Sequence, residues 1–541
     1  MKKLNKITII ALAALTTIGC SENFLDEDTS GFQAPDNTYT NTNGFETGLT
    51  GLYAFARLEF QTWNNPFFSQ GATPQEALQV GTDIVAIKGT GTDATLAPFS
   101  NYTLNPASSY VRNYWKFAYG LIGNANLILE ALNNTGIDWK DPQKDPMLVK
   151  GTASYFRAYA YRYLISLYGD VPWVDKVTKD PRTDFTRTPK MEVVQHMIED
   201  LKSAAANLPE NPANVAEGKL TKWAALHYLT EAYLWANKPD SAIWAANQVI
   251  NSGFYRLNDQ RFGVGKDNEG DYFHDMFIEN NQNRKSGNME TIWAMQLEYN
   301  AQGGGDLYTD WSKRAWVPFY AQQAGFLLAD SLGGRGLGHI RPYDWWLNSY
   351  ETNDVRNSKY NIKRDWYHNN PKSSLYGTKL NITNAIKESG NVFATTTKFF
   401  YGKTTDNPAY EGNMKDRVKI RLGETYLLLA EAYLQKNDPA MAAKAINEVR
   451  GRAKATPAQA SQVNVDYLLD ERARELLGEE MRRMTLSRFG KDVFLRRLKI
   501  LNTQSSAIIA GKEDMVPLWP IPQEVIDANS GAVLPQNPGY N

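Results

Sequence analysis

The sequence predicts a mainly α-helical fold, in which repeated helical hairpins form a scaffold and a large irregular, loop-rich region carries the ligand site. Apolar residues recur at helical spacing in several long stretches, and one hairpin pattern occurs twice in the chain. Between about residues 255 and 416 this pattern fades, and glycine and asparagine become frequent. Because structureless segments of that length are uncommon inside compact proteins, we expect short helices, turns and hairpins there.

The clearest hairpin spans residues 421–453. Its first helix carries large apolar residues at helical spacing, namely Leu422, Tyr426, Leu429, Tyr433 and Leu434. Asp438 and Pro439 then separate the two helices: Asp438 can cap the next helix, and Pro439 suits its first turn, where a missing N–H costs nothing. The second helix has small and branched apolar residues on one face, at Ala442, Ala445, Ile446 and Val449. These positions fit the tetratricopeptide pattern of paired helices.

The same register occurs about 200 residues earlier, over residues 220–250, at Leu226, Leu229, Tyr233, Ala242 and Ala246. Lys238 stands at the capping position of this copy, and a third first-helix pattern begins at Phe156. We expect these units to stack, because one hairpin cannot bury both of its faces. Three unrelated helix pairs are the weaker alternative. The tryptophans on the repeat helices are assigned to packing, and they are Trp223, Trp235 and Trp244.

The first 19 residues are predicted to be a lipoprotein signal peptide. Three lysines within the first six residues form a basic start, and the mostly apolar stretch 7–18 is too short to span a membrane. Cys20, the only cysteine, follows Gly19. This arrangement resembles the lipobox of bacterial lipoproteins, which implies cleavage before Cys20 and its acylation. A soluble export signal with an incidental cysteine is the alternative. Residues 20–43 then form the acylated cysteine and a polar tether.

Residues 44–541 are predicted to be one body. Helical patterns cover about 44–60, 110–133, 150–254 and 417–500, and the loop-rich insert covers about 255–416. The charged residues between 471 and 488 could pair along their own helix, and the alternative is that they form a solvated face. Proline-rich segments near the C-terminus favour extended backbone that lies over the surface.

Composition and motifs argue against several classes of function. The net charge is −1, and removal of the leader with its three lysines makes it −4, so nothing favours a polyanionic partner. The five histidines form no H-E-x-x-H motif and no G-x-S-x-G elbow occurs, so we predict no catalytic residue, metal ligand or cofactor. A structural Ca²⁺ site at the acidic loop 267–271 stays open. A pair of catalytic carboxylates also stays open, because the sequence has 59 acidic residues to choose from.

With these features collected, the chain resembles the SusD/RagB family of outer-membrane lipoproteins. The resemblance is carried in order by Cys20 with residues 24–26, then 157–159, 168–172, 424–434, 448–453, 471–472, 475–476, 519–522 and 536–540. It implies a lipid-anchored protein at the cell surface, with helical repeats on one side and ligand-binding loops on the other. It also implies capture of oligosaccharide or polysaccharide, without cleavage, for a SusC-like TonB-dependent transporter.

Loop aromatics beside polar side chains are the candidate ligand-binding residues. A flat ring covers the C–H face of a sugar, while Asp, Asn or Arg pairs with its hydroxyls. Two stretches meet this requirement, one around residues 63–68 and one around residues 310–320. The predicted ligand-binding residues are Trp63, Asn64, Asp83, Trp311, Arg314, Trp316 and Tyr320. For each ring, the alternative is packing in the core.

Two other functions stay open beside glycan capture. A tetratricopeptide scaffold would bind a protein or a non-sugar nutrient, with a helical groove as its site and with its loop tryptophans buried. A glycoside hydrolase would need two opposed carboxylates at an aromatic cleft. The two alternatives differ from glycan capture in what they bind or release, so each has its own test.

Overall fold

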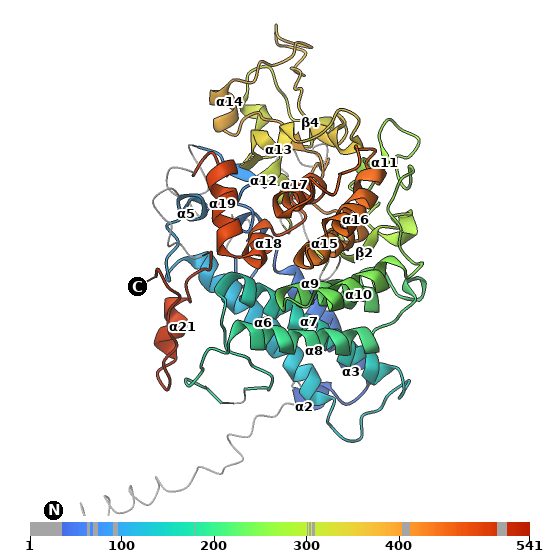
Figure 1. Ribbon diagram of the computed structural model, residues 1–541, viewed down its shortest axis with the longest axis vertical. Coiled ribbons are helices and arrows are strands. Elements are labelled where there is room, and N and C mark those ends of the chain that lie inside the picture. The colour runs from blue at the N-terminus through green and yellow to red at the C-terminus, as the bar shows by residue number, and fades with distance from the viewer. Residues whose placement is uncertain are drawn as a thin grey trace, which may run out of the picture.

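The computed structural model describes residues 35–61, 65–68, 74–89, 96–178, 180–299, 301, 304–305, 309–402, 412–505 and 517–540. Helices dominate these residues, and the prediction of a mainly α-helical fold is confirmed (Figure 1). Short strands pair antiparallel in twos: β1 (Val85–Ile87) with β3 (Ile340–Pro342), β2 (Thr291–Met295) with β6 (Arg417–Arg421), and β4 (Ile362–Lys363) with β5 (Thr395–Thr396). The predicted signal peptide, Cys20 and most of the tether lie outside the described residues.

Long helices form the lower part of the molecule in Figure 1. They are α3 (Thr42–Arg57), α6 (Ser109–Ala131), α7 (Asp145–Tyr168), α8 (Lys190–Asn207), α9 (Lys222–Trp235) and α10 (Pro239–Ile250). Each helix from α6 to α10 packs on the next, and α3 packs on both α6 and α7. Helix α7 is therefore covered on nearly all sides. Its two arginines point outward to partners, Arg157 to Asp200 at 2.7 Å and Arg162 to Glu231 at 2.7 Å.

The two predicted hairpins stack directly on each other. They are α9 with α10, and α15 (Leu422–Gln435) with α16 (Pro439–Arg452), and α10 packs on α15. Ala246 of α10 shares a hydrophobic cluster with Leu427, Ala430 and Ile446. Small residues at this contact let the helix backbones approach closely, so the shared register identified true neighbours. Trp244 on α10 is 53% exposed, however, and its assignment to packing is wrong.

The turns inside the two hairpins have the same backbone geometry. Asn237 and Asn437 both adopt left-handed conformations, with φ of 51° and 56°, and the capping residue after each of them has a φ of −112°. Asp438 accepts a hydrogen bond from the Met441 N–H at 3.0 Å, which is the predicted cap. Lys238 at the matching position forms no side-chain cap. At the start of the second helix, the two hairpins therefore differ in the side chain at the capping position.

The loop-rich region contains short elements, as expected. Its helices are α11 (Tyr272–Asp275), α12 (Ser312–Trp316), α13 (Asp344–Asn348) and α14 (Asn384–Glu388). Its 3₁₀ turns are η4 (Arg284–Ser286), η5 (Tyr320–Gln322), η6 (Asp330–Leu332) and η7 (Val355–Asn357). The region has a small core of its own, which includes Val317, Tyr320, Phe326 and Trp366. It occupies the upper part of the molecule in Figure 1.

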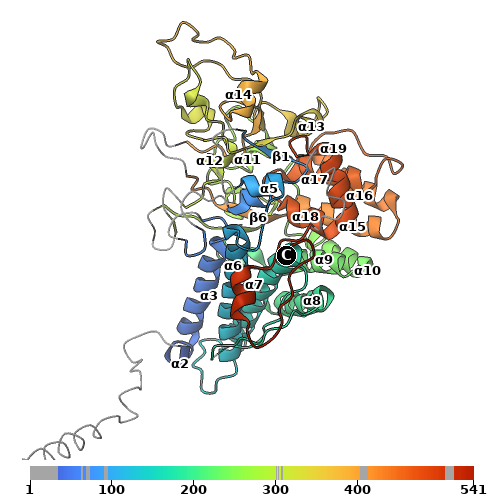
Figure 2. The ribbon, with the colours of Figure 1, turned by 90° about the vertical axis from the view of Figure 1, so that its left-hand side faces the viewer.

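The remaining elements close the structure around this arrangement. They are α2 (Pro35–Thr38), α4 (Pro74–Ala77), α5 (Ala97–Asn101), η3 (Pro212–Asn214), α17 (Val465–Leu476), α18 (Arg482–Phe489), α19 (Lys491–Leu501) and α21 (Gln523–Ala528). Figure 2 shows α21 beside α6, where Lys116 pairs with Glu524 at 2.7 Å. Within the part of the chain that the structure describes, no helix has the length and apolar character that crossing a membrane requires.

Glu471 and Glu475 of α17 are buried, so a solvated face is wrong for these two residues. The Glu471 carboxylate accepts hydrogen bonds from Arg356 and Arg450, both at 2.8 Å. The Glu475 carboxylate accepts from Arg356 at 2.9 Å and also pairs with Arg421 and Arg452. Because α17 packs against both α15 and α13, the side chains of Glu471 and Glu475 face other elements and not water.

Candidate functional site

The two stretches predicted to contact ligand lie next to each other. Gln61, just after α3, pairs with Asp310 in an isolated antiparallel bridge, and Asp310 pairs with Asn413 in another. Trp63 and Asn64 lie outside the described residues. Asn65 donates hydrogen bonds from its amide to the Leu58 and Gln61 carbonyls, at 2.7 and 2.6 Å, which fixes the turn after the helix.

The rings of the second stretch are buried, so the expectation that they face solvent is wrong. Trp311 is only 4% exposed, and Trp316 and Tyr320 are fully buried. Trp316 stacks on Phe399, with ring centroids 5.2 Å apart. Tyr320 packs on Trp366 and donates its hydroxyl to the Ala329 carbonyl at 3.1 Å. Tyr320 belongs to the small core of the loop-rich region, whereas Trp316 belongs to the main hydrophobic core of the molecule.

Asp83 is likewise unavailable to a ligand hydroxyl. It is fully buried, and its carboxylate accepts from Arg482 at 2.7 and 2.8 Å and from Arg497 at 2.8 Å. Burial by itself would raise the pKa of Asp83, but the two guanidinium groups hold it well below its ordinary value. The prediction of Asp83 as a sugar contact is therefore wrong, because this carboxylate is fully occupied by two arginines.

Arg314 differs from the other described candidates because its side chain is only partly buried. Its guanidinium carbon lies 4.0 Å from the centre of the Trp311 ring, which is a close cation–π stack. The buried tryptophan therefore orients a partly exposed arginine at the place where the two stretches meet.

A hollow of about 500 Å³ lies beside this meeting point, and we call it the α3 hollow. One wall is the end of α3, with Gly51, Phe55, Arg57 and Gln61, and the other is formed by Ala301, Gly304, Gly305 and Thr309. Arg57 donates to the Gln296 carbonyl at 2.8 Å, which holds the guanidinium near the rim. Gly305 has a φ of 121°, a conformation that favours glycine, so the second wall turns tightly here.

Sequence reasoning missed these lining residues, although it found their neighbours. Phe55 and Arg57 belong to a helix whose apolar face is buried, and the helical pattern assigns them to the scaffold. Gln61 and Thr309 carry no aromatic ring, and aromatic rings were the signal by which candidate residues were chosen. Their position immediately before each candidate stretch is the feature that could have identified them.

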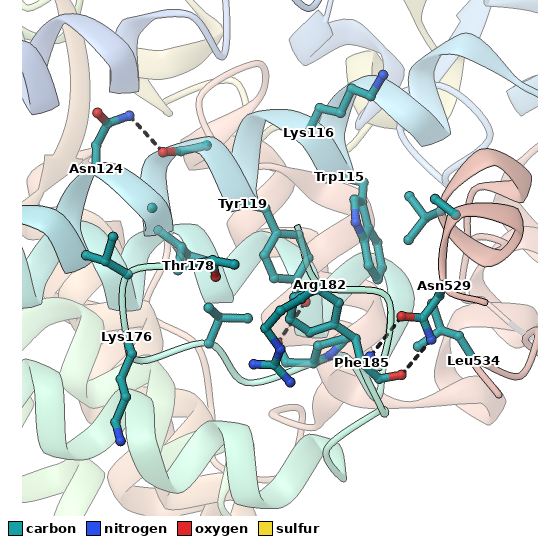
Figure 3. A pocket seen from close by; sticks show the side chains of 18 of the residues that line it. Trp115, Lys116, Tyr119, Asn124, Lys176, Thr178, Arg182, Phe185, Asn529 and Leu534 are labelled. Carbon is teal, nitrogen blue, oxygen red and sulfur yellow. Dashed lines mark hydrogen bonds between the residues drawn. The ribbon is translucent and has the colours of Figure 1, made fainter. Parts of the chain in front are cut away.

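A second hollow, which we call the α6 pocket, has a volume of about 690 Å³. It lies between α6, the segment around residues 172–185 and the C-terminal segment around residues 524–534. Figure 3 shows the rings of Trp115, Tyr119 and Phe185 around the same space, with Leu534 and Asn529 at one side. Sequence analysis did not predict this pocket, because its walls come from three distant segments.

The described residues contain no group of three or more His, Cys, Asp or Glu side chains that could hold a metal ion. In the acidic loop considered for Ca²⁺, Asp271 caps α11 through the His274 N–H at 2.8 Å. The same carboxylate accepts from Ser358 at 2.6 Å and from Asn361 at 3.0 Å. These protein donors occupy the oxygens that a cation would need.

Comparison with known proteins identifies the family. The profile described as "SusD family" matches residues 289–540, and the profile described as "Starch-binding associating with outer membrane" matches residues 60–234. SusD-like protein P2 of Formosa agariphila is 25% identical over the full length of both chains. A SusD-like protein of Bacteroides ovatus is 24% identical over 87% of this chain and 80% of that protein.

Solved structures show the same fold. A SusD homologue of Bacteroides thetaiotaomicron has a TM-score of 0.72 at 19% identity, over 94% of this chain and 98% of that one. A laminarin binding SusD-like protein has a TM-score of 0.66 at 21% identity, over 93% and 100%. Surface glycan-binding protein A of Bacteroides fluxus has a TM-score of 0.66 at 19% identity, over 92% and 99%. Together with the two profile matches, which follow one another along most of the chain, these similarities show that the protein belongs to the SusD/RagB family.

Proposed function

We propose that this protein captures oligosaccharide or polysaccharide at the cell surface and delivers it to a SusC-like TonB-dependent transporter without cleaving it. Membership of the SusD/RagB family supports carbohydrate binding, and two of the similar solved proteins are described as laminarin binding and as glycan-binding. Acylated Cys20 holds the protein on the outer membrane in this proposal. No cofactor takes part.

The observation that carries the proposal is the α3 hollow at the meeting point of the two candidate stretches. Its lining offers the Phe55 ring, the Arg57 guanidinium, the Gln61 amide and the Thr309 hydroxyl. A sugar needs such a mixture, because its C–H groups gain from an apolar surface while its hydroxyls need hydrogen-bond partners. Trp63 and Asn64, which follow Gln61 in the chain, remain proposed contacts together with Arg314.

A glycine on α3 allows a direct test of the α3 hollow. Gly51 lines the hollow, and a Cβ added there would meet no other atom within 4 Å. Gly51→Trp therefore fills the hollow. It should not weaken the helix, because glycine is the poorest helix former after proline. In protein lacking residues 1–20, we expect Gly51→Trp to weaken binding of the glycan found on an array at least tenfold, as measured by calorimetry.

Gly123→Trp is the matched control. Gly123 lies on α6, lines the α6 pocket and also has open space at its Cβ. The Gly123→Trp variant should bind the glycan as tightly as the unmodified protein does. Equal binding by both variants would place the glycan elsewhere, and an array without any bound glycan would refute the proposal itself. A chelator should leave the affinity unchanged, and a day of incubation should release no new reducing ends.

The anchor and the delivery step have separate tests. Cys20→Ala is expected to move the protein from the membrane fraction to the soluble fraction of the cell, because acylation supplies the attachment. The unmodified protein should co-purify with a TonB-dependent transporter from detergent extracts. Retention of Cys20→Ala in the membrane fraction without that transporter would contradict the acyl anchor.

A second candidate function is a scaffold that binds a protein through its repeat helices. It is favoured by the burial of Trp311 and Trp316 and by Trp244, which is 53% exposed on α10. For this function, Trp244→Ala would remove binding of the protein partner, and no glycan would quench the tryptophan fluorescence. For glycan capture, Trp244→Ala leaves glycan affinity unchanged.

A further inference from the structure

The α6 pocket is lined mainly by apolar groups. Its floor and walls include Trp115, Tyr119, Leu127, Phe185 and Leu534, which come from α6, the segment before α8 and the C-terminal segment. Its volume of about 690 Å³ falls in the range of small-molecule sites, which is roughly 300–1,000 Å³. Figure 3 shows three of these rings around one space, so a flat ligand would have an aromatic surface on more than one side.

Two polar side chains of the walls, Tyr119 and Asn529, already have partners. The Tyr119 hydroxyl donates to the Pro172 carbonyl at 2.8 Å. The Asn529 amide accepts from the Phe185 N–H and donates to the Phe185 and Ala532 carbonyls, each at 2.8 Å. A ligand with many hydroxyls would bury several of those hydroxyls in this pocket without hydrogen-bond partners. Each hydroxyl buried in that way is costly. The buried part of the ligand is therefore apolar, which distinguishes this pocket from the α3 hollow.

The charged groups at the rim are mainly basic. Three cations, Lys116, Lys176 and Arg182, line the pocket with one carboxylate, Glu524, which is bound to Lys116 at 2.7 Å. Lys176 has no ion pair within the part of the chain that the structure describes. In Figure 3 the amines of Lys116 and Lys176 extend away from the centre, whereas Arg182 lies over the pocket.

Arg182 is placed to receive an anion. Its guanidinium carbon is 4.6 Å from the centre of the Phe185 ring, so it sits on an aromatic wall. It is bound to Asp184 at 2.9 Å, but the two side chains are 51% and 60% exposed. Exposed ion pairs of this kind contribute little to stability, so the guanidinium can exchange Asp184 for a ligand carboxylate at small cost. Arginine also matches a carboxylate with two parallel hydrogen bonds.

We propose that the α6 pocket binds a free aromatic carboxylate. Its ring lies among Trp115, Tyr119 and Phe185, and its carboxylate binds the Arg182 guanidinium. This site is separate from the α3 hollow and does not depend on glycan capture. The mainly apolar walls suit such a ring better than a neutral oligosaccharide.

The test uses 2-naphthoate as the probe and 2-naphthamide as its neutral counterpart, with protein lacking residues 1–20. We expect calorimetry to show binding of the naphthoate and at least tenfold weaker binding of the amide. Arg182→Gln should lower the affinity for naphthoate to that for the amide and leave the amide unaffected. Gly123→Trp, which fills the pocket, should remove binding of both, while Gly51→Trp should change neither.

Three results would overturn the proposal. Unchanged naphthoate binding in Gly123→Trp would place the probe elsewhere, and equal affinities for acid and amide would remove the role of Arg182. Displacement of naphthoate by the glycan bound by the protein would show a carbohydrate site. Melting temperatures of both glycine variants at or above that of the unmodified protein verify that they fold. Loss of naphthoate binding with glycan binding intact separates this proposal from glycan capture.

Discussion

Asp83 joins two arginines that lie about 400 residues away in the chain. Both guanidinium groups are buried, so removal of the carboxylate charge leaves Arg482 with Glu480 and Arg497 with Asp470 as their remaining close carboxylate partners. We expect Asp83→Asn to lower the free energy of unfolding by about 3–5 kcal/mol, as measured by urea denaturation at pH 7. Glu269→Gln is the control, because Glu269 and Lys359 form an ion pair that is exposed on both sides. That variant should unfold like the unmodified protein.

Glu76 makes stability depend on pH in the opposite sense to most carboxylates. Burial raises its pKa from 4.5 to about 7, although Arg417 lowers it. The folded protein therefore holds a proton that the unfolded chain releases above pH 4.5, and the free energy of unfolding falls as pH rises from about 4.5 to 7. Glu76→Gln should remove this fall.

The Glu76→Gln prediction is measured as a difference between two pH values. We expect the variant to gain about 3 kcal/mol over the unmodified protein at pH 8 and little at pH 4.5, in urea denaturation. An equal gain at both pH values would show that the pKa of Glu76 is the same in the folded and the unfolded protein, which would contradict the prediction.

At the scale of single residues, the sequence did not predict which side chains are buried and which face solvent. A tryptophan in a Gly-rich segment has the same local pattern whether it faces solvent, as expected for Trp311, or a core formed by distant residues, as found. Asp83 was likewise expected at the surface, because its local sequence does not show that two distant arginines cover it. Burial depends on segments that local sequence does not specify.

At the scale of elements, the two stacked hairpins offer a matched pair of caps. Asp438 caps α16, whereas Lys238 leaves α10 without a side-chain cap, and the backbone angles of the two positions are similar. Asp438→Ala should therefore cost about 1 kcal/mol of stability, and Lys238→Asp should add about 0.5–1 kcal/mol. Thermal unfolding followed by circular dichroism measures both. A loss of stability in Lys238→Asp would contradict the equivalence of the two turns.

The helices and their stacking were predictable because local periodicity and a shared register contain that information. The environment of α17 was not, because a helical pattern of charged residues looks alike on a solvated face and between two packed layers. Glu471 and Glu475 are buried only because α13 and α15 cover them. Their arginine partners come from as far away as Arg356.

At the scale of the molecule, scaffold and loop-rich region are joined by buried charges. Arg356 lies in the loop-rich region, and it binds Glu471 and Glu475 of α17 at 2.8 and 2.9 Å. The strand pair β2–β6 makes another connection, since β6 leads directly into α15. We expect the two parts to unfold together. Circular dichroism at 222 nm and tryptophan fluorescence should then give the same urea midpoint, and separate midpoints would contradict this coupling.

The family could be predicted from the order of short motifs along the chain, whereas the hollows could not. Each hollow has walls from segments that are distant in sequence, such as Phe55 and Thr309, or Trp115 and Phe185. Because the lining residues are scattered along the chain, they form no sequence motif that could be recognised. Only the folded arrangement brings them to one place.

The contact between α10 and α15 also has a consequence for biosynthesis. About 170 residues separate the end of α10 from the start of α15, so a ribosome adding ~5–20 residues per second needs ~10–30 s to supply the missing partner. Until then the side of α10 with Ile243, Ala246 and Ile250 is uncovered in the nascent chain. A chaperone that shields this apolar strip during synthesis would keep the half-made stack from aggregating.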